Sequence, residues 1–293
     1  MNSLKVGFIG VGNMGMAMAK PLVKKGFEVT VRDLNPGAVE EITALGAKAA
    51  SSSRELAENS DVIITMVRDI EQTDEVLFGR EGAWGGLKQN AIIMISNSVG
   101  PEYCRNLYEK AKAKGFKVVD CAVSDPSGAL HSVEGGLTLM IGGDEEDVKK
   151  CQPIFEAIGK NIFHLGGIGM GQTYKLVNNL ATFNIGAVNR EVLNFGLKAG
   201  LDLEKMTEVI CASTGGSWGM WFQGQQRKAR KQRGSATQAP PRNKVGKNAA
   251  VPPEKRLAAE MARKVGAQLP IDEFLSTLDT EAVYSAYLAK TRE

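Results

Sequence analysis

A glycine-rich turn near the start of the chain constrains the fold more than any other feature of the sequence. The stretch GFIGVGNMGMAMAK, residues 7–20, joins a short apolar run to a helix-like pattern through glycines spaced G-x-G-x-x-G. Because each glycine costs backbone entropy, this spacing needs a physical reason. Gly10 permits a tight turn, Gly12 leaves no side chain between the backbone and a pyrophosphate, and Gly15 lets helix and strand pack closely. The turn therefore predicts a strand–turn–helix unit that holds a dinucleotide.

The same spacing also occurs in tight turns that bind nothing, but here an acidic residue follows at a suitable distance. The N–H groups at the helix start, including those of Asn13 and Met14, would face the pyrophosphate. The next strand-like run, FEVTVRD, ends in Asp33, whose carboxylate could accept hydrogen bonds from the adenosine ribose. Since a carboxylate repels a 2'-phosphate, the sequence favours NAD over NADP. The neighbouring Arg32 could pair with a phosphate, but we expect it to point into solvent.

Apolar runs typical of strands alternate with amphipathic helical patterns through the first half of the chain. The main runs are VGFIG, FEVTVRD, DVIITMV, AIIMIS, FKVVDCAV and LTLMIGG. Their continuous apolar character is typical of strands covered on both faces, which predicts an α/β fold with a doubly wound parallel sheet. Strand patterns stop near Gly166, and a long helical pattern begins at Gly171. We therefore predict a dinucleotide-binding domain over residues 1–167 and an all-helical domain over residues 168–293.

A basic segment, residues 223–253, fits neither predicted domain. It holds eight Lys or Arg and no acidic residue, and its apolar side chains beyond alanine and proline are Val245 and Val251. This composition predicts disorder in isolation. One interpretation is a basic arm for nucleic acid; the other is a mobile loop or a stretch foreign to the protein, such as a displaced reading frame. The second is favoured because no aromatic residues are interleaved for base stacking, so nucleic acid is not an expected partner.

Cysteine and histidine usage excludes several kinds of site. The four cysteines form no CxxC pair, so neither a disulfide framework nor a zinc site is expected. Only His131 and His164 occur, which leaves little scope for a His-rich metal centre or a Ser-His-Asp hydrolase. No apolar run is long enough to span a bilayer, and the opening MNSLKVGFIG enters a strand at once, without a secretory leader. These features together favour the cytoplasm and no membrane partner.

Hydride transfer between a nicotinamide and an alcohol or carbonyl also needs a group that accepts and donates a proton. With histidine so scarce, a lysine is the better candidate, because burial and neighbouring charges can lower its pKa. The stretch GIGMGQTYKLVNN places Lys175 and Asn179 four residues apart, on one face of the long helix. The alternative is a lysine on an ordinary exposed helix face. Its position at the domain junction, beside Gly169 and Gly171, favours a functional lysine.

Four motifs in this order give the chain its resemblance to the β-hydroxyacid dehydrogenase family, which contains 3-hydroxyisobutyrate dehydrogenase and tartronate semialdehyde reductase. They are GFIGVGNMGMAMAKPL, ISNSVGP, DCAVSDPSGALHSVEGGLTLMIGG and GMGQTYKLVNN. The resemblance implies a Rossmann-like domain joined by a long helix to an all-helical domain, assembled as a homodimer or homotetramer. It also implies that Lys175 is the acid/base catalyst, that Ser124 and Asn179 position the substrate, and that Ser98 seats nicotinamide and substrate.

The function implied by this resemblance is NAD-dependent hydride transfer to or from a small anionic β-hydroxy acid or its semialdehyde. Asp125 and Pro126 stand where the family has two glycines, which adds a carboxylate where a substrate carboxylate would be held. Arg68 replaces a usual proline, and we expect it to compensate Asp125 or to bind an anionic group. The family's second lysine aligns with Lys255 in an uncertain register, next to the basic segment.

Two other functions remain open at this stage. One is a catalytically weak or inactive dinucleotide-binding protein that acts through interactions, although retention of Lys175, Asn179 and Ser124 argues against it. The other is imine reduction on the same fold, which the lysine disfavours because such relatives commonly lack it.

Overall fold

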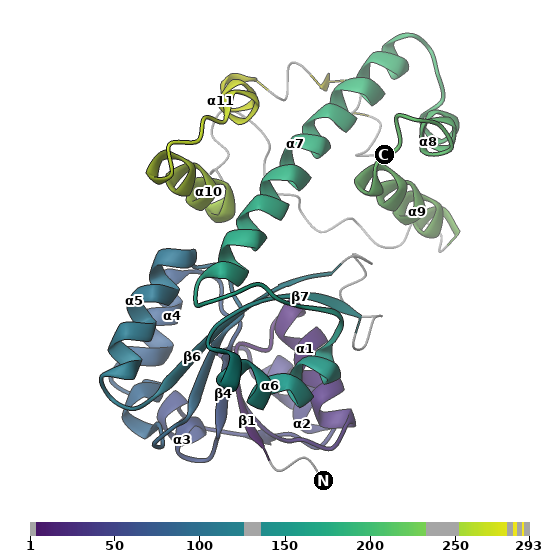
Figure 1. The fold of residues 1–293 in the computed structure, drawn as a ribbon. Coiled ribbons are helices and arrows are strands. Elements are labelled where there is room, and N and C mark those ends of the chain that lie inside the picture. The colour runs from purple at the N-terminus through teal and green to yellow at the C-terminus, as the bar shows by residue number, and fades with distance from the viewer. Residues whose placement is uncertain (1–3, 126–135, 233–251, 280–283, 286–288, 290–293) are drawn as a thin grey trace. The chain divides into compact units, whose positions relative to one another are not determined.

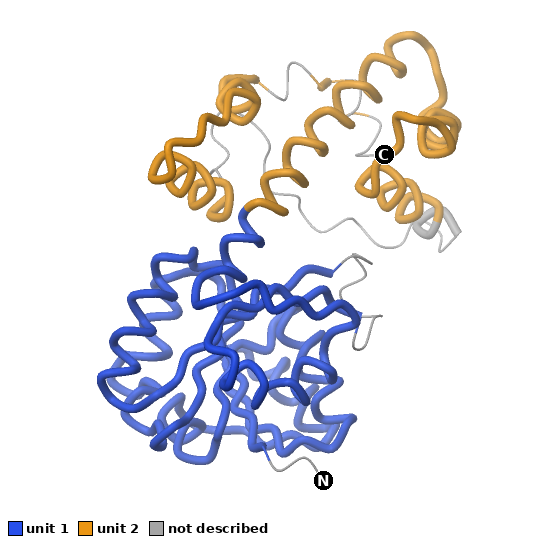
Figure 2. Tube along the Cα trace, viewed as in Figure 1, with its two compact units in different colours: residues 1–176 blue, residues 177–293 orange. Residues whose placement is uncertain are grey.

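The chain divides into two compact units, residues 1–176 and residues 177–293 (Figure 2). The computed structural model describes residues 4–125, 136–232, 252–279, 284–285 and 289. The division falls within helix α7 (Met170–Lys198), later in the chain than the boundary predicted after residue 167. The start of α7 belongs to the first unit because the N–H groups of Gly169 and Gln172 donate to a carboxylate of the sheet. Leu176, at the division, is only 2% exposed.

The first unit is built on one eight-stranded sheet with the order β3-β2-β1-β4-β5-β6-β7-β8 (Figure 1). The strands are β1 (Lys5–Ile9), β2 (Glu28–Arg32), β3 (Lys48–Ala49), β4 (Val62–Thr65), β5 (Ile92–Ile95), β6 (Lys117–Ser124), β7 (Leu137–Gly142) and β8 (Gly159–His164). All neighbours pair in parallel except β6 and β7, which are antiparallel. The predicted doubly wound sheet is confirmed, whereas the antiparallel β7 departs from an all-parallel sheet.

Helices cover both faces of this sheet. They are α1 (Asn13–Lys24), α2 (Pro36–Thr43), α3 (Ser53–Glu58), α4 (Ile70–Phe78), α5 (Pro101–Lys112) and α6 (Glu145–Ile158), with a short 3-10 turn, η1 (Ala83–Gly86). Alternate residues of β4 point to opposite faces, so that Val62 and Ile64 pack with α1, α2 and α6 while Ile63 packs with α3, α4 and α5. Because both faces are covered, the strands read as continuous apolar runs.

The register aligns the carboxyl ends of the central strands. Ile9, Thr65, Ile95 and Asp120 occupy equivalent positions on β1, β4, β5 and β6. Strand β6 then continues beyond this row to Ser124, and its extra residues pair with β7 rather than with β5. Ligands of open α/β sheets bind outside the carboxyl ends of the strands, so the extension of β6 reaches into the region where a site is expected.

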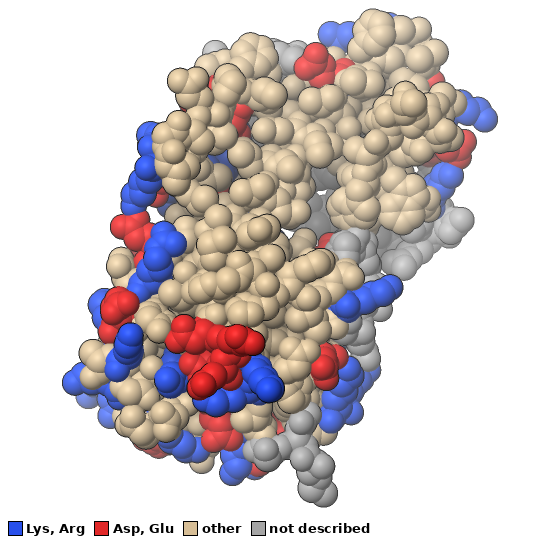
Figure 3. Space-filling view, viewed as in Figure 1, with Lys and Arg blue, Asp and Glu red and all other residues tan. Residues whose placement is uncertain are grey.

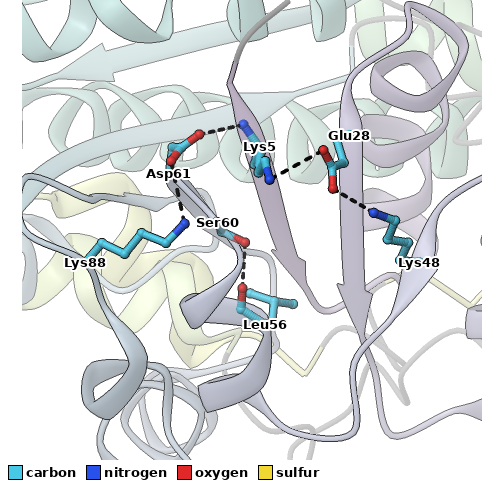
Figure 4. Close-up of polar contacts among 7 residues, drawn as sticks. All are labelled: Lys5, Glu28, Lys48, Leu56, Ser60, Asp61 and Lys88. Atoms are coloured by element: carbon cyan, nitrogen blue, oxygen red, sulfur yellow. Dashed lines mark hydrogen bonds and ion pairs between the residues drawn. The ribbon is translucent and has the colours of Figure 1, made fainter.

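The amino ends of the strands form a charged edge on the opposite side of the sheet (Figure 4). Glu28 lies between two lysines, with its carboxylate oxygens 2.7 Å from Lys48 Nζ and 3.8 Å from Lys5 Nζ. Asp61 accepts a hydrogen bond from the backbone N–H of Lys5 at 2.9 Å and lies 3.9 Å from Lys88 Nζ. These pairs are exposed and stabilise the sheet only weakly, so this edge carries no candidate chemistry.

The second unit has only helices as elements of secondary structure in the described part of residues 177–293. It contains most of α7 and the helices α8 (Leu203–Cys211), α9 (Trp218–Gln232), α10 (Pro253–Lys264) and α11 (Pro270–Thr277). A small core joins Leu193 of α7 to Leu203, Met206 and Met220 of the following helices. The predicted all-helical domain is confirmed for this part of the chain.

The basic segment is described in part. Residues 223–232 continue α9, and residues 233–251 lie outside the described residues. Lys228 Nζ lies 2.7 Å from Glu208 Oε1, and Arg227 donates a hydrogen bond to Thr207 Oγ1 at 3.1 Å. Residues 223–232 are therefore helical, unlike the disorder expected for the segment in isolation, and α8 supplies partners for Arg227 and Lys228.

Apolar side chains remain exposed along α7 of the second unit. Ile185, Val188, Val192 and Phe195 recur every three or four residues, and their exposed fractions range from 43% to 74%. On the face drawn in Figure 3, acidic and basic side chains are interspersed over the first unit, while much of the visible surface of the second unit is uncharged. Among the described helices, none combines the length and the hydropathy of a bilayer-spanning segment.

Candidate active site

The glycine turn links β1 to α1 at the carboxyl edge of the sheet, and its three glycines have different roles in the fold. Gly10 has a φ of +93°, and a Cβ there would meet the carbonyl oxygen of Met66. A Cβ at Gly15 would meet the carbonyl oxygen of Gly10. By contrast, a Cβ at Gly12 would find no described atom within 4 Å, and its φ of −64° is open to any residue. The fold thus requires Gly10 and Gly15, whereas Gly12 keeps open a space next to the backbone.

The start of α1 faces that open space with polar backbone groups. Gly12 is the N-cap, no side chain caps the helix, and no acidic residue lies in its first turn. The first N–H groups of a helix have no acceptor within the helix, and here they include those of Asn13 and Met14. Together with the helix dipole, such groups attract an anion. The predicted pyrophosphate site therefore fits the geometry of this turn.

Asp33 is held beside the same turn by hydrogen bonds from the backbone. Its Oδ2 accepts from the N–H of Val11 at 2.7 Å, and its Oδ1 accepts from the N–H of Asn35 at 2.8 Å. These bonds orient the half-buried carboxylate at the end of β2, directly next to the glycine turn. Arg32, which was expected to extend into solvent, is half-buried and folds back so that its guanidinium donates to the carbonyl of Asp33.

Lys175 turns toward the sheet from the second turn of α7. Its half-buried Nζ donates a hydrogen bond to the carbonyl oxygen of Val123 at 2.7 Å. Val123 immediately precedes Ser124, so the amine lies beside the residue that sequence analysis assigned to the substrate. A lysine ammonium has three protons to donate, and this bond uses one of them. The structure therefore brings Lys175 and the end of β6 together.

The other predicted residues have different surroundings. Ser98 is half-buried in the loop after β5, and Asn179 is half-buried one helical turn beyond Lys175, where Asn178 donates to its Oδ1 at 3.5 Å. Arg68 forms an ion pair with the adjacent Asp69 at 3.2 Å. Asp125 is half-buried, and Pro126 and His131 lie outside the described residues.

A buried polar network that was not predicted from the sequence lies next to these residues. Asp120 is fully buried, and its carboxylate accepts hydrogen bonds from the N–H groups of Gly169 at 2.5 Å and Gln172 at 2.7 Å. Burial raises the pKa of this carboxyl, although the backbone hydrogen bonds oppose that shift. The available signal was a charged residue inside the apolar run FKVVDCAV, since a carboxylate in a buried strand needs partners.

Cys104 of α5 and Cys121 of β6 are buried near Asp120. Burial raises the pKa of the Cys104 and Cys121 thiols well above their ordinary range, which makes them poor nucleophiles. Across the described ranges, His, Cys, Asp and Glu side chains form no cluster of three or more that could hold a metal ion.

Comparison with known proteins identifies the two parts of the chain. Residues 5–166 match the model of the NAD-binding domain of 6-phosphogluconate dehydrogenase, and residues 169–239 match a model described as NAD-binding of NADP-dependent 3-hydroxyisobutyrate dehydrogenase. The chain is 34% identical to the NAD-dependent L-serine dehydrogenase of Pseudomonas aeruginosa over 218 residues, which is 74% of this chain and 72% of that protein. Identity to the 2-(hydroxymethyl)glutarate dehydrogenase of Eubacterium barkeri is 37% over 218 residues, with the same coverage of 74% and 72%.

The fold comparison agrees with these sequence matches. The crystal structure of 3-hydroxyisobutyrate dehydrogenase from Salmonella typhimurium superposes with a TM-score of 0.78 at 26% identity, over 98% of this chain and 95% of that one. The matched NAD-binding models and the NAD-dependent relative support NAD as the cofactor. The chain therefore belongs to the β-hydroxyacid dehydrogenase family of NAD-binding oxidoreductases.

Proposed function

We propose that this protein is an NAD-dependent dehydrogenase that oxidises a small β-hydroxy acid or reduces the matching semialdehyde, with Lys175 as the general acid/base. The observation that carries the proposal is the hydrogen bond of Lys175 Nζ to the Val123 carbonyl, which holds the amine beside Ser124. This lysine lies in the same unit as the glycine turn and Asp33. Hydride transfer and proton transfer would therefore both take place at the carboxyl ends of the strands.

The proposed substrate class follows from what the named relatives have in common. L-serine, 3-hydroxyisobutyrate and 2-(hydroxymethyl)glutarate, the compounds in the relatives' names, all carry a hydroxymethyl group on the carbon next to a carboxylate. We propose that the substrate of this protein shares that unit. Asp125 follows Ser124, where the family has glycine, and its negative charge favours a substrate whose other substituent is neutral or cationic.

The proposed mechanism gives each residue one task. Bound NAD supplies the hydride acceptor for the hydroxyl-bearing carbon. In oxidation, Lys175 accepts the hydroxyl proton in its neutral form; in reduction, its ammonium donates a proton to the carbonyl oxygen. The Val123 carbonyl orients the amine, Ser124 and Asn179 bind the substrate's polar groups, and Ser98 contributes a hydroxyl on the nicotinamide side.

The cofactor preference is proposed from Asp33. Its carboxylate accepts two backbone hydrogen bonds beside the glycine turn, which fix it where an adenosine ribose would lie. Ribose hydroxyls can donate to it, whereas a 2'-phosphate would be repelled. We therefore propose NAD in preference to NADP, although one matched model is described by an NADP-dependent enzyme.

Two further parts of the proposal concern the protein's state in the cell. The exposed apolar positions of α7, with Phe195 the most exposed of them, support a homodimer or homotetramer. All four cysteines are free, which supports a reducing compartment such as the cytoplasm.

The decisive experiment compares wild type, Lys175→Ala and the control Lys149→Ala, which removes an exposed lysine from α6. NAD reduction is followed with L-serine, 3-hydroxyisobutyrate, glycerate, threonate, 4-hydroxybutyrate and sulfonated analogues, and repeated with NADP. General acid–base catalysis contributes about 10²–10⁴-fold, so Lys175→Ala should lose turnover by that factor while binding NAD normally. Turnover retained in Lys175→Ala would refute the assignment. Wild-type silence across the panel with intact NAD binding would favour the non-catalytic alternative.

A further inference from the structure

The side chain of Gln172 is fully buried and bonded to three backbone groups of one loop. Its Oε1 accepts hydrogen bonds from the N–H groups of Val99 and Gly100, both at 3.1 Å. Its Nε2 donates to the carbonyl oxygen of Asn97 at 2.9 Å. These three partners flank Ser98 on both sides. The amide of Gln172 therefore fixes the backbone that carries Ser98.

The backbone of Gln172 is anchored to β6 at the same time. Its N–H donates to Asp120 Oδ2 at 2.7 Å, while the N–H of Gly169 donates to Oδ1 at 2.5 Å. Three residues further along α7, Lys175 Nζ bonds to the carbonyl of Val123 on the same strand. The start of α7 is thus held on β6 at two points, through Asp120 at Gln172 and through Val123 at Lys175.

The loop is fixed from its other side as well. Thr65 Oγ1 donates to Asn97 Oδ1 at 2.9 Å, and Asn97 Nδ2 donates to Thr73 Oγ1 at 2.8 Å. Asn97 and both threonines are buried. The side-chain amides of Gln172 and Asn97 are both hydrogen-bonded on their oxygen and their nitrogen. A small shift of Gln172 must therefore break one of these bonds or move the loop or the helix.

We propose that Gln172 is a positioning residue that sets the Ser98 loop relative to Lys175. The proposal rests on the function proposed above, since it concerns the alignment of two residues of that same site. Gln172 acts through them, not on the substrate. Its amide is suited to this task because it offers an acceptor for two N–H groups and a donor for one carbonyl, a combination that an ionised carboxylate cannot supply.

In Gln172→Glu, the alignment of the Ser98 loop with Lys175 should depend on pH. The protonated carboxyl can donate to the Asn97 carbonyl and accept from Val99 and Gly100, as the amide does. The ionised carboxylate has no donor, so its second oxygen faces the Asn97 carbonyl and repels it. Burial raises the pKa of the introduced carboxyl above its ordinary value of about 4.3.

The ionisable groups around this network act on the pKa of the introduced carboxyl in both directions. Asp120 on β6 is a carboxyl next to the backbone of Gln172, and its ionised form would add like-charge repulsion. Cys104 on α5 stays neutral because burial raises its thiol pKa. Arg105 on α5 and Lys175 on α7 are cations that act in the opposite direction, but the Lys175 amine bonds to Val123 and not to Gln172.

The test measures kcat and KM for the hydroxy acid as ratios to wild type across pH, in Gln172→Glu and in the control Gln89→Glu. Gln89 is exposed and also donates to a backbone carbonyl, that of Gly115 at 3.2 Å. A displacement of about 1 Å can cost about 100-fold in rate, so kcat of Gln172→Glu should fall by that order at high pH and recover as the pH falls. The Gln89→Glu ratio should stay near unity throughout. A pH-independent ratio near unity in folded Gln172→Glu would overturn the proposal.

Hydrogen exchange at the Val99 and Gly100 amides gives a second readout that needs no turnover. Gln172→Glu should lose protection at these two amides at high pH and regain it at low pH, whereas Gln89→Glu should match wild type. If wild type has no activity but this pattern appears, the proposed function fails while the loop contact stands. If activity is present and the pattern is absent, the positioning role fails alone. Should Gln172→Glu not fold, Gln172→Met tests the same contact, with kcat lowered at every pH and no recovery.

Discussion

Substitution of Gly12 by alanine should weaken NAD binding without changing the stability of the fold. A Cβ at this position meets no described atom within 4 Å, and the backbone there is extended with φ −64° and ψ −165°. Loss of glycine at an N-cap costs about 0.5–1 kcal/mol, while the reduced entropy of the unfolded chain returns about 0.4–1 kcal/mol. We therefore expect a change in the free energy of unfolding close to zero.

The effect of Gly12→Ala on the affinity for NAD should be much larger than its effect on stability. An added methyl group would stand between the first turn of α1 and the pyrophosphate, and would lengthen its contacts with the backbone N–H groups. Hydrogen bonds to charged groups are worth about 1.5–3 kcal/mol each, so weakening one or two of them should cost about 2–4 kcal/mol. Since 1.4 kcal/mol corresponds to a factor of about ten, the Kd for NAD should rise about 30- to 1000-fold.

The matched control is Gly15→Ala, which adds the same methyl group three residues further along. Here the Cβ would meet the carbonyl oxygen of Gly10, so α1 must move away from β1. Overpacking of this kind costs about 1–3 kcal/mol. Calorimetric titration with NAD and thermal unfolding should therefore give weak binding at normal Tm for Gly12→Ala, and a lowered Tm for Gly15→Ala. Wild-type affinity in Gly12→Ala, or an equal loss of Tm in both variants, would refute the reasoning.

Three other predictions follow from single contacts. Asp33→Ser should raise the relative use of NADP in steady-state kinetics, and should lower stability because the N–H groups of Val11 and Asn35 lose their acceptor. Phe195→Glu, at an exposed position of α7, should reduce the molar mass measured by light scattering if this helix joins copies of the chain. The hydrogen bond from Lys48 lowers the pKa of Glu28 below 4.5, so its stabilising effect is present above pH 4.5 and is lost as the pH falls through the lowered value. Chemical denaturation of Glu28→Gln should therefore differ from wild type at neutral pH and low salt, and agree with it in acid or high salt.

The strands of the sheet could be located from the sequence because burial on both faces leaves a continuous apolar run. Strands β4 and β5 are buried at every residue, and both were predicted. Strand β3 was not, since Lys48 and Ala49 are exposed and too few to form a pattern. The direction of β7 was also missed, because an apolar run does not reveal whether its neighbour runs parallel or antiparallel.

The site residues also differ in how readily the sequence suggests them. The glycine turn and Asp33 could be proposed as a cofactor site because their spacing along the chain is typical of a dinucleotide-binding unit. Gln172 could not, because a single polar residue in a helical pattern is typical of an exposed face. Its proposed role depends on its contacts with the loop of residues 97–100, which lies far away in sequence. Local patterns therefore identify residues that face a ligand more readily than those that align them.

The antiparallel strand that the sequence did not reveal is also what positions the candidate chemistry. A sheet edge leaves backbone groups unpaired, and β6 continues past the end of β5 for the residues from Cys121 to Ser124. Pairing with β7 satisfies that extension, so β6 can project rigidly beyond the other strands. Asp120 at its base binds the start of α7, and Val123 near its tip binds the amine of Lys175. Asp120 and Val123 both pair with β7, to Gly142 and Leu139, so the antiparallel strand supports the stretch of β6 that carries the helix anchor and the amine acceptor.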